Sequence, residues 1–454
     1  MGNRFQQFDK RYRTRFRRRT RSVASQAWQY LRGLMQARRK NMERMEEVVP
    51  ECDYQSLQHF LSHSEWDARG VMDQVASEAD GHLGGTADSC LLLDESAFAK
   101  KGKKSVGVAR QWSGRQGKVD NCQVAVFAAL AQGCHSTLID TRLYLPKEWA
   151  TDPQRCRAAG VPESEIVLKS KSELALEMVR QARQNRVRFS WVGTDGGYGK
   201  EPSFLRHLED HGETFVSDVH KDQRVYLEDP APFVPTRQGD RGKKPTSLQA
   251  RLESQRVDDW AQSQSAPSWQ QVVVRAGTKG ELRVEALGAR VWLWDGKETQ
   301  ARLWHLVVTR ELSSPTTIKY ALSNASSETS LERLVQMQRQ RFWIERSFED
   351  GKSSSGLGDY QVRGWLAWHH HMALVMMAML FMLEERLVHE QSHPLLSCSD
   401  IEILLAHFLP QRDTSREEIV RQMKARHQAR QRSIEAAYAR QRRDDAQGRS
   451  ATTL

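Results

Sequence analysis

The sequence predicts an α/β protein in which a mixed-sheet domain is interrupted by a β-rich insertion, preceded by a helical N-terminal domain and followed by a helical, basic tail. Three observations support this fold class. Short apolar runs separated by Gly, Lys and Asn begin after Ser89, a pattern typical of neighbouring strands. Helical periodicity dominates the chain before about Asp80 and returns from Leu331. The length of 454 residues exceeds one compact core, because domains contain roughly 100 to 200 residues each.

The N-terminal segment, residues 1–85, is expected to be helical and to contact DNA. Tyr54, Leu57, Phe60 and Leu61 have the spacing of one helical face. Nine of the first 22 residues are Lys or Arg, and such cations bind the phosphates of a DNA backbone. The alternative is a solvated charged arm with no ligand.

Residues 86–220 are expected to form the first part of the mixed sheet. Apolar runs of strand length alternate there with amphipathic helices, which is the pattern of an α/β domain. The expected elements are strands within CLLLDESAF, SVGVARQW and CQVAVFAALA, a helix over Ser172–Gln184, a strand over Phe189–Asp195, a helix near Ser203–His211 and a strand within ETFVSDV.

The β-rich insertion is assigned to residues 221–330, where Pro, Gly, Gln and charged residues precede four apolar runs with Gly-bearing turns. These runs are QQVVVRAG, LRVEALG, ARVWLWDG and RLWHLVVTR. Residues 331–390 return to helices, which Gly356 and Gly358 interrupt before a long apolar helix that begins near Trp365. Residues 391–454 form the basic tail, predicted to be a solvated helix or a disordered arm.

Composition favours an anionic partner. Lys and Arg total 68 against 57 Asp and Glu, a formal net charge of +11 that suits nucleic acid or a membrane surface. No amphipathic anchor accompanies the charge, so no membrane partner is expected. The run Met372–Leu383 is shorter than the roughly 18 to 20 residues of a bilayer span, and predicts a buried core helix. The basic N-terminus precedes no apolar signal core, so we expect a cytoplasmic protein associated with the nucleoid.

The six cysteines point to reduced, mostly buried thiols. They lie far apart, with no Cys-x-x-Cys pair and no Cys/His spacing suited to structural zinc. A bound metal is therefore expected to have oxygen ligands, which favours Mg²⁺ or Mn²⁺ over Zn²⁺.

Two acidic residues follow apolar runs that read as buried strands. Asp94 comes directly after Leu91–Leu93, and Asp195 comes directly after Trp191–Thr194. Both carboxylates are expected to emerge at strand ends on one edge of the sheet, where they repel each other unless a cation such as Mg²⁺ neutralises them. Taken singly, either residue is more simply explained as a turn residue, because Asp suits turns.

A third acid lies in the predicted helix QRFWIERSFEDGK. Arg341, Glu345, Phe348 and Lys352 are spaced 4, 3 and 4 residues apart and share one helical face. A solvent-exposed helix also shows such acid and base pairs. The neighbouring apolar and aromatic residues indicate partial burial, which makes an idle charge stripe less favourable. Glu349, one turn beyond Glu345, is a rival ligand by spacing alone.

Two further clusters are less specific. Lys100, Lys101, Lys103 and Lys104 follow the first strand and could guide DNA, although a solvated lysine turn explains them equally well. Consecutive residues His369–His371 point about 100° apart on a helix and cannot all bind one ion, so packing or DNA contact is the better explanation.

The strings IERSFEDGKSSSGLGDYQVRGW, LLLDESAFAKKGK and WVGTDGGYG resemble bacterial insertion-sequence transposases of the DDE type. More narrowly, the chain is similar to the 701 branch of the insertion sequence 4 superfamily over nearly its whole length. The resemblance implies a ribonuclease H-like fold with catalytic, metal-binding Asp94, Asp195 and Glu345, the last on a helix after the insertion. The family's helix motif is Tyr, Arg, Glu and Lys; here Gln338 stands in the tyrosine's place.

What the resemblance implies for chemistry is strand cleavage and strand transfer with two Mg²⁺ ions, for which Mn²⁺ can substitute. Asp94 would bridge both ions, and Asp195 and Glu345 would each complete one coordination shell. Arg341 and Lys352 would hold phosphates beside them, and Lys100, Lys103 and Lys104 would guide the DNA.

A base-binding tryptophan is also found in the inserted domain of some relatives. Trp292 and Trp294 are candidates for this role by residue type only. Core packing explains both more simply, because aromatic residues alternate naturally in strands.

The expected partners are double-stranded DNA, as terminal inverted repeats and as target, and a second copy of the chain in a synaptic homodimer. The alternatives are a nuclease of the same fold without strand transfer, and an inactive DNA-binding derivative.

Overall fold

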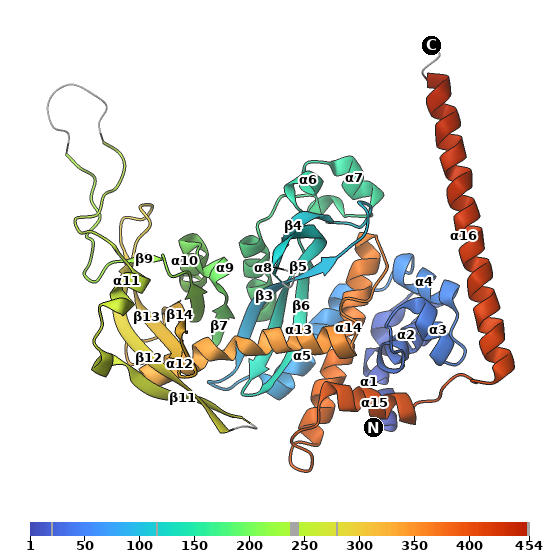
Figure 1. Ribbon diagram of the computed structural model, residues 1–454, viewed down its shortest axis with the longest axis horizontal. Coiled ribbons are helices and arrows are strands. Elements are labelled where there is room, and N and C mark those ends of the chain that lie inside the picture. Colours follow the sequence, from blue (N-terminus) through green and yellow to red (C-terminus); the bar gives the residue numbers. More distant parts are fainter. Residues whose placement is uncertain (20, 115–116, 237–244, 278–279, 452–454) are drawn as a thin grey trace.

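The centre of the protein is a ten-stranded mixed sheet (Figure 1). The structure is a computed structural model and describes residues 1–19, 21–114, 117–236, 245–277 and 280–451. The strand order is β11-β12-β13-β14-β8-β7-β3-β5-β4. β6 also pairs with β5, along residues 125–132, beyond the stretch that pairs with β4. The strands of the first part are β3 (Cys90–Ala99), β4 (Ala109–Ser113), β5 (Lys118–Gln132), β6 (His135–Leu143), β7 (Trp191–Thr194) and β8 (Phe215–Val219).

The sheet is mixed in the way the sequence predicts. β3, β7 and β8 run parallel, whereas β5 is antiparallel to β3. The apolar run Leu91–Leu93 is fully buried, as expected for strands covered on both faces. Short helices connect these strands and cover the sheet: α6 (Lys147–Ala150), α7 (Pro153–Ala158), α8 (Lys171–Gln184), α9 (Gly196–Gly199) and α10 (Pro202–Asp210).

The β-rich segment extends this same sheet. Its long strands are β11 (Gln270–Gly277), β12 (Gly280–Leu293), β13 (Arg302–Glu311) and β14 (Ser314–Ser323). β14 pairs antiparallel with β8, from Tyr320 opposite Val219 to Ser323 opposite Val216. The expectation of two strands around Gly288 is wrong, because β12 runs through this residue with an unbroken ladder to β13. Leu331 packs so closely over Gly288 that an added Cβ would lie 3.0 Å from its Cδ1 atom.

Smaller elements precede β11. β9 (Arg224–Val225) and β10 (Gln255–Arg256) form a two-stranded sheet, followed by α11 (Val257–Gln262).

The N-terminal helices surround one long apolar helix, α14 (Trp365–Val388). They are α1 (Gly2–Tyr12), α2 (Ala24–Gln36), α3 (Met42–Val48), α4 (Tyr54–Ser62) and α5 (Ala68–Leu83). α14 is long and apolar enough to cross a membrane by length and composition, but 89% of its most apolar window is buried inside the fold. The prediction of a buried core helix over Met372–Leu383 is therefore confirmed. Arg4 of α1 closes this packing with an ion pair to the buried Glu385 at 2.6 Å.

Two consecutive helices cross the sheet and join its halves (Figure 1). α12 (Leu331–Gln340) packs against β8 and β11–β13, and α13 (Phe342–Ser354) packs against β3, β5 and β6. Arg341 forms the junction between them, with φ −54° and ψ −27°. This junction places the predicted third acid over the strands that carry the first two.

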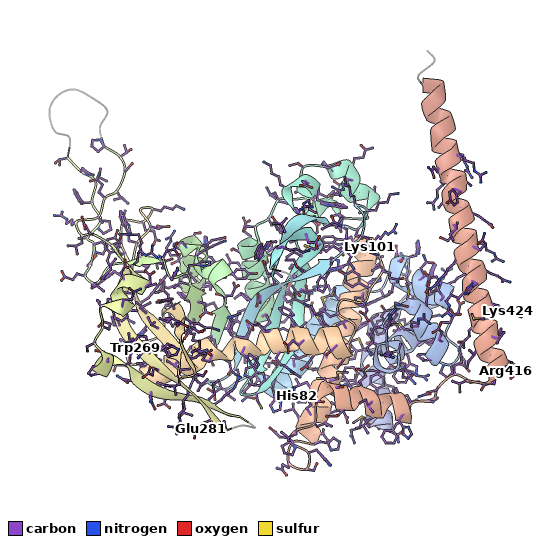
Figure 2. All side chains as sticks on the ribbon, in the orientation of Figure 1. His82, Lys101, Trp269, Glu281, Arg416 and Lys424 are labelled. Atoms are coloured by element: carbon purple, nitrogen blue, oxygen red, sulfur yellow. The ribbon has the colours of Figure 1, made fainter. Side chains whose placement is uncertain are left out.

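The tail is helical. α15 (Cys398–Phe408) packs against α2, α13 and α14, whereas α16 (Arg416–Ala451) projects away from the body (Figure 1). The labels of Arg416 and Lys424 in Figure 2 mark the first turns of this projecting helix. Ion pairs from Arg426 to Glu47 and from Arg430 to Glu43 fasten its first half to α3. The described side chains of α16 are mostly exposed.

Candidate active site

The first two acids lie side by side on adjacent parallel strands. The last paired residues of β3 and β7 are Leu93 and Thr194, so Asp94 and Asp195 follow at the next position of the register. The expectation that Asp94 closes its strand is wrong, since β3 continues to Ala99. Its pairing with β5 persists there, with Asp94 opposite Phe127. It is the shorter neighbour β7 that ends, which opens the edge of the sheet beside Asp94.

Asp195 also caps a short helix. Its Oδ1 accepts hydrogen bonds from the N–H groups of Gly197 at 2.9 Å and Tyr198 at 3.4 Å, at the start of α9. Gly199 lets this helix lie against β8, because an added Cβ would meet the Asp218 carbonyl oxygen at 1.9 Å. The turn role expected of this aspartate is thus real, and the second carboxylate oxygen accepts neither of these bonds.

Arg341 connects the third acid to the first. Its Nη1 atom lies 2.8 Å from Glu345 Oε1 and 3.5 Å from Asp94 Oδ2, and its Nε lies 3.2 Å from Asp218 Oδ2. Asp94 and Glu345 therefore share one guanidinium nitrogen although 251 residues separate them in the sequence, as their numbers show. An arginine held by three carboxylates has little rotational freedom and fixes the register of α13 over the sheet.

Asp218 is a fourth acid, which the sequence pattern did not single out. It lies at the end of β8 and anchors Arg341 from the side opposite Glu345. Gln338 donates to Asp218 Oδ1 at 3.0 Å and accepts a hydrogen bond from Thr309 at 3.1 Å. Gln338 is therefore a buried side chain that braces Asp218 and does not reach the cleft. The available signal was the strand ETFVSDV, in which an acid follows an apolar run as in the two other strands.

A cleft of about 910 Å³ lies beside this network. All three predicted acids line it, together with Phe348 and Lys352 from the same helical face. The full lining is Asp94, Glu95, Ser96, Ala97, Trp112, Gly114, Asp195, Glu345, Arg346, Phe348, Glu349, Asp350, Lys352 and Ser353. The structure thus brings the three predicted acids, distant in the sequence, to one cleft.

Among the three predicted acids, Asp94 has a pKa shifted far from its ordinary value. Burial, together with the charges of Asp195 and Glu345, raises its pKa from 3.8 to about 7, against the opposing effect of Arg341. Burial also raises the pKa of Asp218, which Arg341 again opposes. A set of crowded carboxylates with one shared arginine is short of positive charge, and hard oxygen donors suit Mg²⁺ or Mn²⁺.

Arg341 stands between the carboxylates of Asp94 and Glu345 and keeps them apart. Within the described residues, the cleft acids do not form a group whose potential ligand atoms all lie within 4.8 Å of one another. Cys134, His135 and Glu390 do form such a group, and none of them lines this cleft. A cation can take over the bridging role of the guanidinium. The three acids thus supply to one cleft the oxygen donors that divalent metals prefer, without forming a closed ligand set in this structure.

Two further charged residues of α13, Lys352 and Glu349, line the cleft. Lys352 lines the cleft, with its Nζ 5.6 Å from the Phe348 ring centre. Glu349 lines it as well, but its side chain is 72% exposed and pairs with Arg346 at 3.5 Å rather than with Arg341. Geometry therefore connects Glu345, and not its rival Glu349, to the other acids.

The lysines after β3 lie outside the lining of the cleft. Lys100 packs against Tyr360, with its Nζ 3.3 Å from the ring centre and a 3.2 Å hydrogen bond to the carbonyl oxygen. Burial lowers its pKa to about 8. Lys103 and Lys104 are exposed, in the loop that Lys101 marks in Figure 2. Lys100 thus braces the fold at this point, whereas the other two face solvent and can meet a large anionic ligand.

The three consecutive histidines are packing residues. His370 stacks on Trp66 with ring centres 3.9 Å apart, and both of its ring nitrogens face backbone carbonyls. His371 pairs with the Tyr30 hydroxyl at 2.8 Å and with the Gly356 carbonyl at 3.1 Å. Burial lowers the pKa of each to about 4 and about 3, respectively, so both are neutral at pH 7.

Trp112 is a further cleft residue that sequence reasoning missed. It lies on β4 and remains 56% exposed, an unusual state for so large an apolar side chain. The two tryptophans that were candidates by type lie outside the cleft lining: Trp292 pairs with Tyr226 through its backbone, and the Trp294 ring centre lies 6.5 Å from that of Tyr226. No periodicity marks Trp112, because β4 is an edge strand whose exposure depends on the fold.

Comparison with known proteins gives two findings. Residues 11–281 match the family described as DDE superfamily endonuclease, a stretch that includes Asp94 and Asp195 and ends before Glu345. The chain is also 24% identical over 196 residues to "Probable transposase for insertion sequence element IS701" from Microchaete diplosiphon. That alignment covers 42% of this chain and 47% of the relative, so it spans about half the length of the curated relative.

Proposed function

Since the chain belongs to the DDE superfamily endonucleases, we propose that it is a DNA transposase that cleaves strands at transposon ends and joins them to target DNA. The observation that carries the proposal is the convergence of Asp94, Asp195 and Glu345 on one open cleft. The similarity to an insertion-sequence transposase supports the biological class. Strand cleavage and strand transfer can use the same site, because only the nucleophile differs between them.

Nucleases of this family use divalent metal ions, and we assign the metal ligands to Asp94, Asp195 and Glu345. Two Mg²⁺ ions, or Mn²⁺ in their place, would activate the attacking water or 3′-hydroxyl and stabilise the leaving oxygen. Asp94 would gain most from a bound cation, because the charges of both other acids act on it. The raised pKa of Asp94 in the metal-free protein is what a bound cation would lower.

The cations around the acids have separate tasks. Arg341 neutralises the acids before metal binding and, with Asp218 holding its Nε, presents its remaining N–H groups to a phosphate oxygen. Lys352, on the same helical face as Arg341 and Glu345, lines the cleft and would contact a neighbouring phosphate. Lys103 and Lys104 guide the flanking DNA, and Lys100 supports the loop that they occupy.

Trp112 is proposed to contact a nucleobase near the scissile phosphate. Its exposed ring faces the cleft that holds the acids, and base–aromatic stacking contributes roughly 1 to 3 kcal/mol per base. Stacking on an unpaired base would hold the strand end in position after cleavage.

The rest of the chain is proposed to handle DNA and assembly. Residues 1–85 would bind DNA, residues 86–220 and 331–390 would form the ribonuclease H-like core around the insertion at 221–330, and residues 391–454 would reach a partner or DNA. A homodimer would hold two transposon ends together.

The test uses the DNA that flanks the gene, supplied as blunt and as pre-cleaved ends with a target plasmid. Joined products from pre-cleaved ends establish strand transfer, whereas cleavage without joining identifies a nuclease of the same fold. Asp94→Ala should abolish both reactions in Mg²⁺ and in Mn²⁺. Glu328→Gln, in an exposed loop, serves as the matched control and should retain them. Wild-type protein that neither cuts nor joins, yet binds the ends, would instead support an inactive derivative.

A further inference from the structure

A second cluster of potential metal ligands lies outside the lining of the catalytic cleft. Gly133 and Cys134 form the tight turn between β5 and β6, and His135 is the first residue of β6. Glu390 follows the C-terminal end of α14. The potential ligand atoms of Cys134, His135 and Glu390 all lie within 4.8 Å of one another. None of these three residues lines the cleft that holds Asp94.

The histidine at the centre of the cluster has one satisfied and one unsatisfied nitrogen. Its Nε2 lies 3.0 Å from Glu390 Oε1, and its side chain is only 14% exposed. Its Nδ1 is buried and makes no hydrogen bond within the described structure. The Cys134 thiol is the group that acts most strongly on this ring, so the thiol, the imidazole and the carboxylate are close neighbours. An ion shared with Glu390 would bind Nε2, the nitrogen that the carboxylate faces.

We propose that Cys134, His135 and Glu390 bind a Zn²⁺ ion, with water in the fourth position. A thiolate, an imidazole and a carboxylate are the ligand types of zinc sites, and three protein ligands leave one open position. The soft thiolate selects zinc over magnesium, which prefers oxygen ligands. The site is therefore chemically distinct from the all-carboxylate cleft.

Charge balance is compatible with this assignment. Cys134 as thiolate and Glu390 as carboxylate supply two negative charges, equal to the charge of the ion. The Cys134 thiol would lose its proton on binding, because metals bind the thiolate. Arg386 is close enough to act electrostatically on both Cys134 and His135, and it disfavours a cation there. The two anionic ligands offset this repulsion, whereas a site with neutral ligands alone would not.

The ion would fasten three parts of the fold to one another. The β5–β6 turn belongs to the central sheet, and Glu390 extends from the core helix α14. Ser136, next to His135, is hydrogen bonded to the Trp343 carbonyl at 3.1 Å and to Ser347 at 2.8 Å in α13. Zinc would therefore clamp the sheet, the central helix and the helix that carries Glu345, without entering the reaction.

The test measures metal binding by the full-length protein. Protein stripped with a chelator is titrated with Co²⁺, whose bond to a thiolate gives a ligand-to-metal absorption band in the near ultraviolet, and then with Zn²⁺ as competitor. We expect one ion per chain, displacement of the cobalt band by Zn²⁺, and a higher melting temperature with Zn²⁺. Neither readout depends on DNA cleavage, so the result stands apart from the proposed function.

Three variants decide the assignment. Cys134→Ser should remove the cobalt band, and Glu390→Gln should weaken binding by at least the roughly 10- to 100-fold that loss of an outer-shell partner causes. Cys398→Ser changes a buried cysteine in α15 and should keep both the cobalt band and the affinity for the ion. Because Cys134 is exposed in a turn, its metal-free variant should melt like the wild type, which excludes misfolding. Absence of the band in wild-type protein, or an equal band in Cys134→Ser, would overturn the proposal.

Discussion

Replacing Asp94 by Asn should stabilise the metal-free protein at alkaline pH while it destroys activity. In the folded protein the pKa of Asp94 is raised from 3.8 to about 7 by burial and by Asp195. Between these pH values the unfolded chain has lost the proton that the folded chain keeps, so stability falls as pH rises through this interval. Above about pH 7 the loss is complete.

The size of the stability change follows from the difference between the two pKa values of Asp94. One pH unit of difference corresponds to about 1.4 kcal/mol, which sets an upper limit of about 4 kcal/mol on the penalty at pH 8. Asn has the shape of Asp without its charge, and Arg341 keeps its contacts with Asp218 and Glu345. We therefore expect Asp94→Asn to gain between about 1 and 4 kcal/mol at pH 8 and almost nothing at pH 4.

The assay is urea unfolding at pH 4 and pH 8, with a chelator and with Mg²⁺. Mg²⁺ should stabilise the wild type at pH 8, because a ligand that binds only the folded state raises stability by mass action. It should not stabilise Asp94→Asn, while Glu328→Gln should respond like the wild type. The reasoning is refuted if Asp94→Asn is less stable than wild type at pH 8, or if Mg²⁺ stabilises both equally.

Three further outcomes are expected. Arg341→Lys, which loses the planar fork that joins the acids, should lower the cleavage rate at least about tenfold with the fold intact by circular dichroism; an unchanged rate contradicts the bridging role. Trp112→Ala should weaken binding of single-stranded ends by about 1 to 3 kcal/mol in Ca²⁺ filter-binding assays, with Trp112→Phe largely restoring it; equal losses in both variants speak against stacking. Because the pKa values of His370 and His371 are lowered to about 4 and about 3, stability should fall as pH drops below 6.5, where the unfolded chain binds these protons first. His371→Gln should flatten that slope in urea titrations, and an unchanged slope would be contrary evidence.

Local sequence pattern was enough to single out the three acids of the candidate site one by one. Asp94 and Asp195 follow apolar runs whose burial is a property of each short segment, and the face of α13 repeats at helical spacing. What joins these pieces is long-range pairing. The parallel register of β3 and β7 places the two aspartates side by side, and no local signal encodes it.

The features that sequence reasoning missed depend on contacts between distant segments. Asp94 lies within its strand because β5, which follows it in the chain, pairs with the whole of β3. Asp218 matters because α12 and α13 bring Gln338 and Arg341 to it. The β-rich segment extends the central sheet because β14 pairs with β8, although about a hundred residues of chain lie between them.

The same limit explains why the proposed zinc site was not expected. Six isolated cysteines argued against zinc on spacing alone, since the third ligand, Glu390, lies 255 residues beyond His135. Adjacent Cys134 and His135 form no recognised spacing, and only the packing of α14 against β6 supplies the carboxylate.

The most direct measurement of the central claim is anomalous diffraction from a crystal soaked in Mn²⁺. The account predicts manganese in contact with Asp94, Asp195 and Glu345, with Arg341 displaced from between the acids. Manganese that contacts none of these carboxylates, in crystals whose protein cleaves DNA in the same ion, would contradict the account.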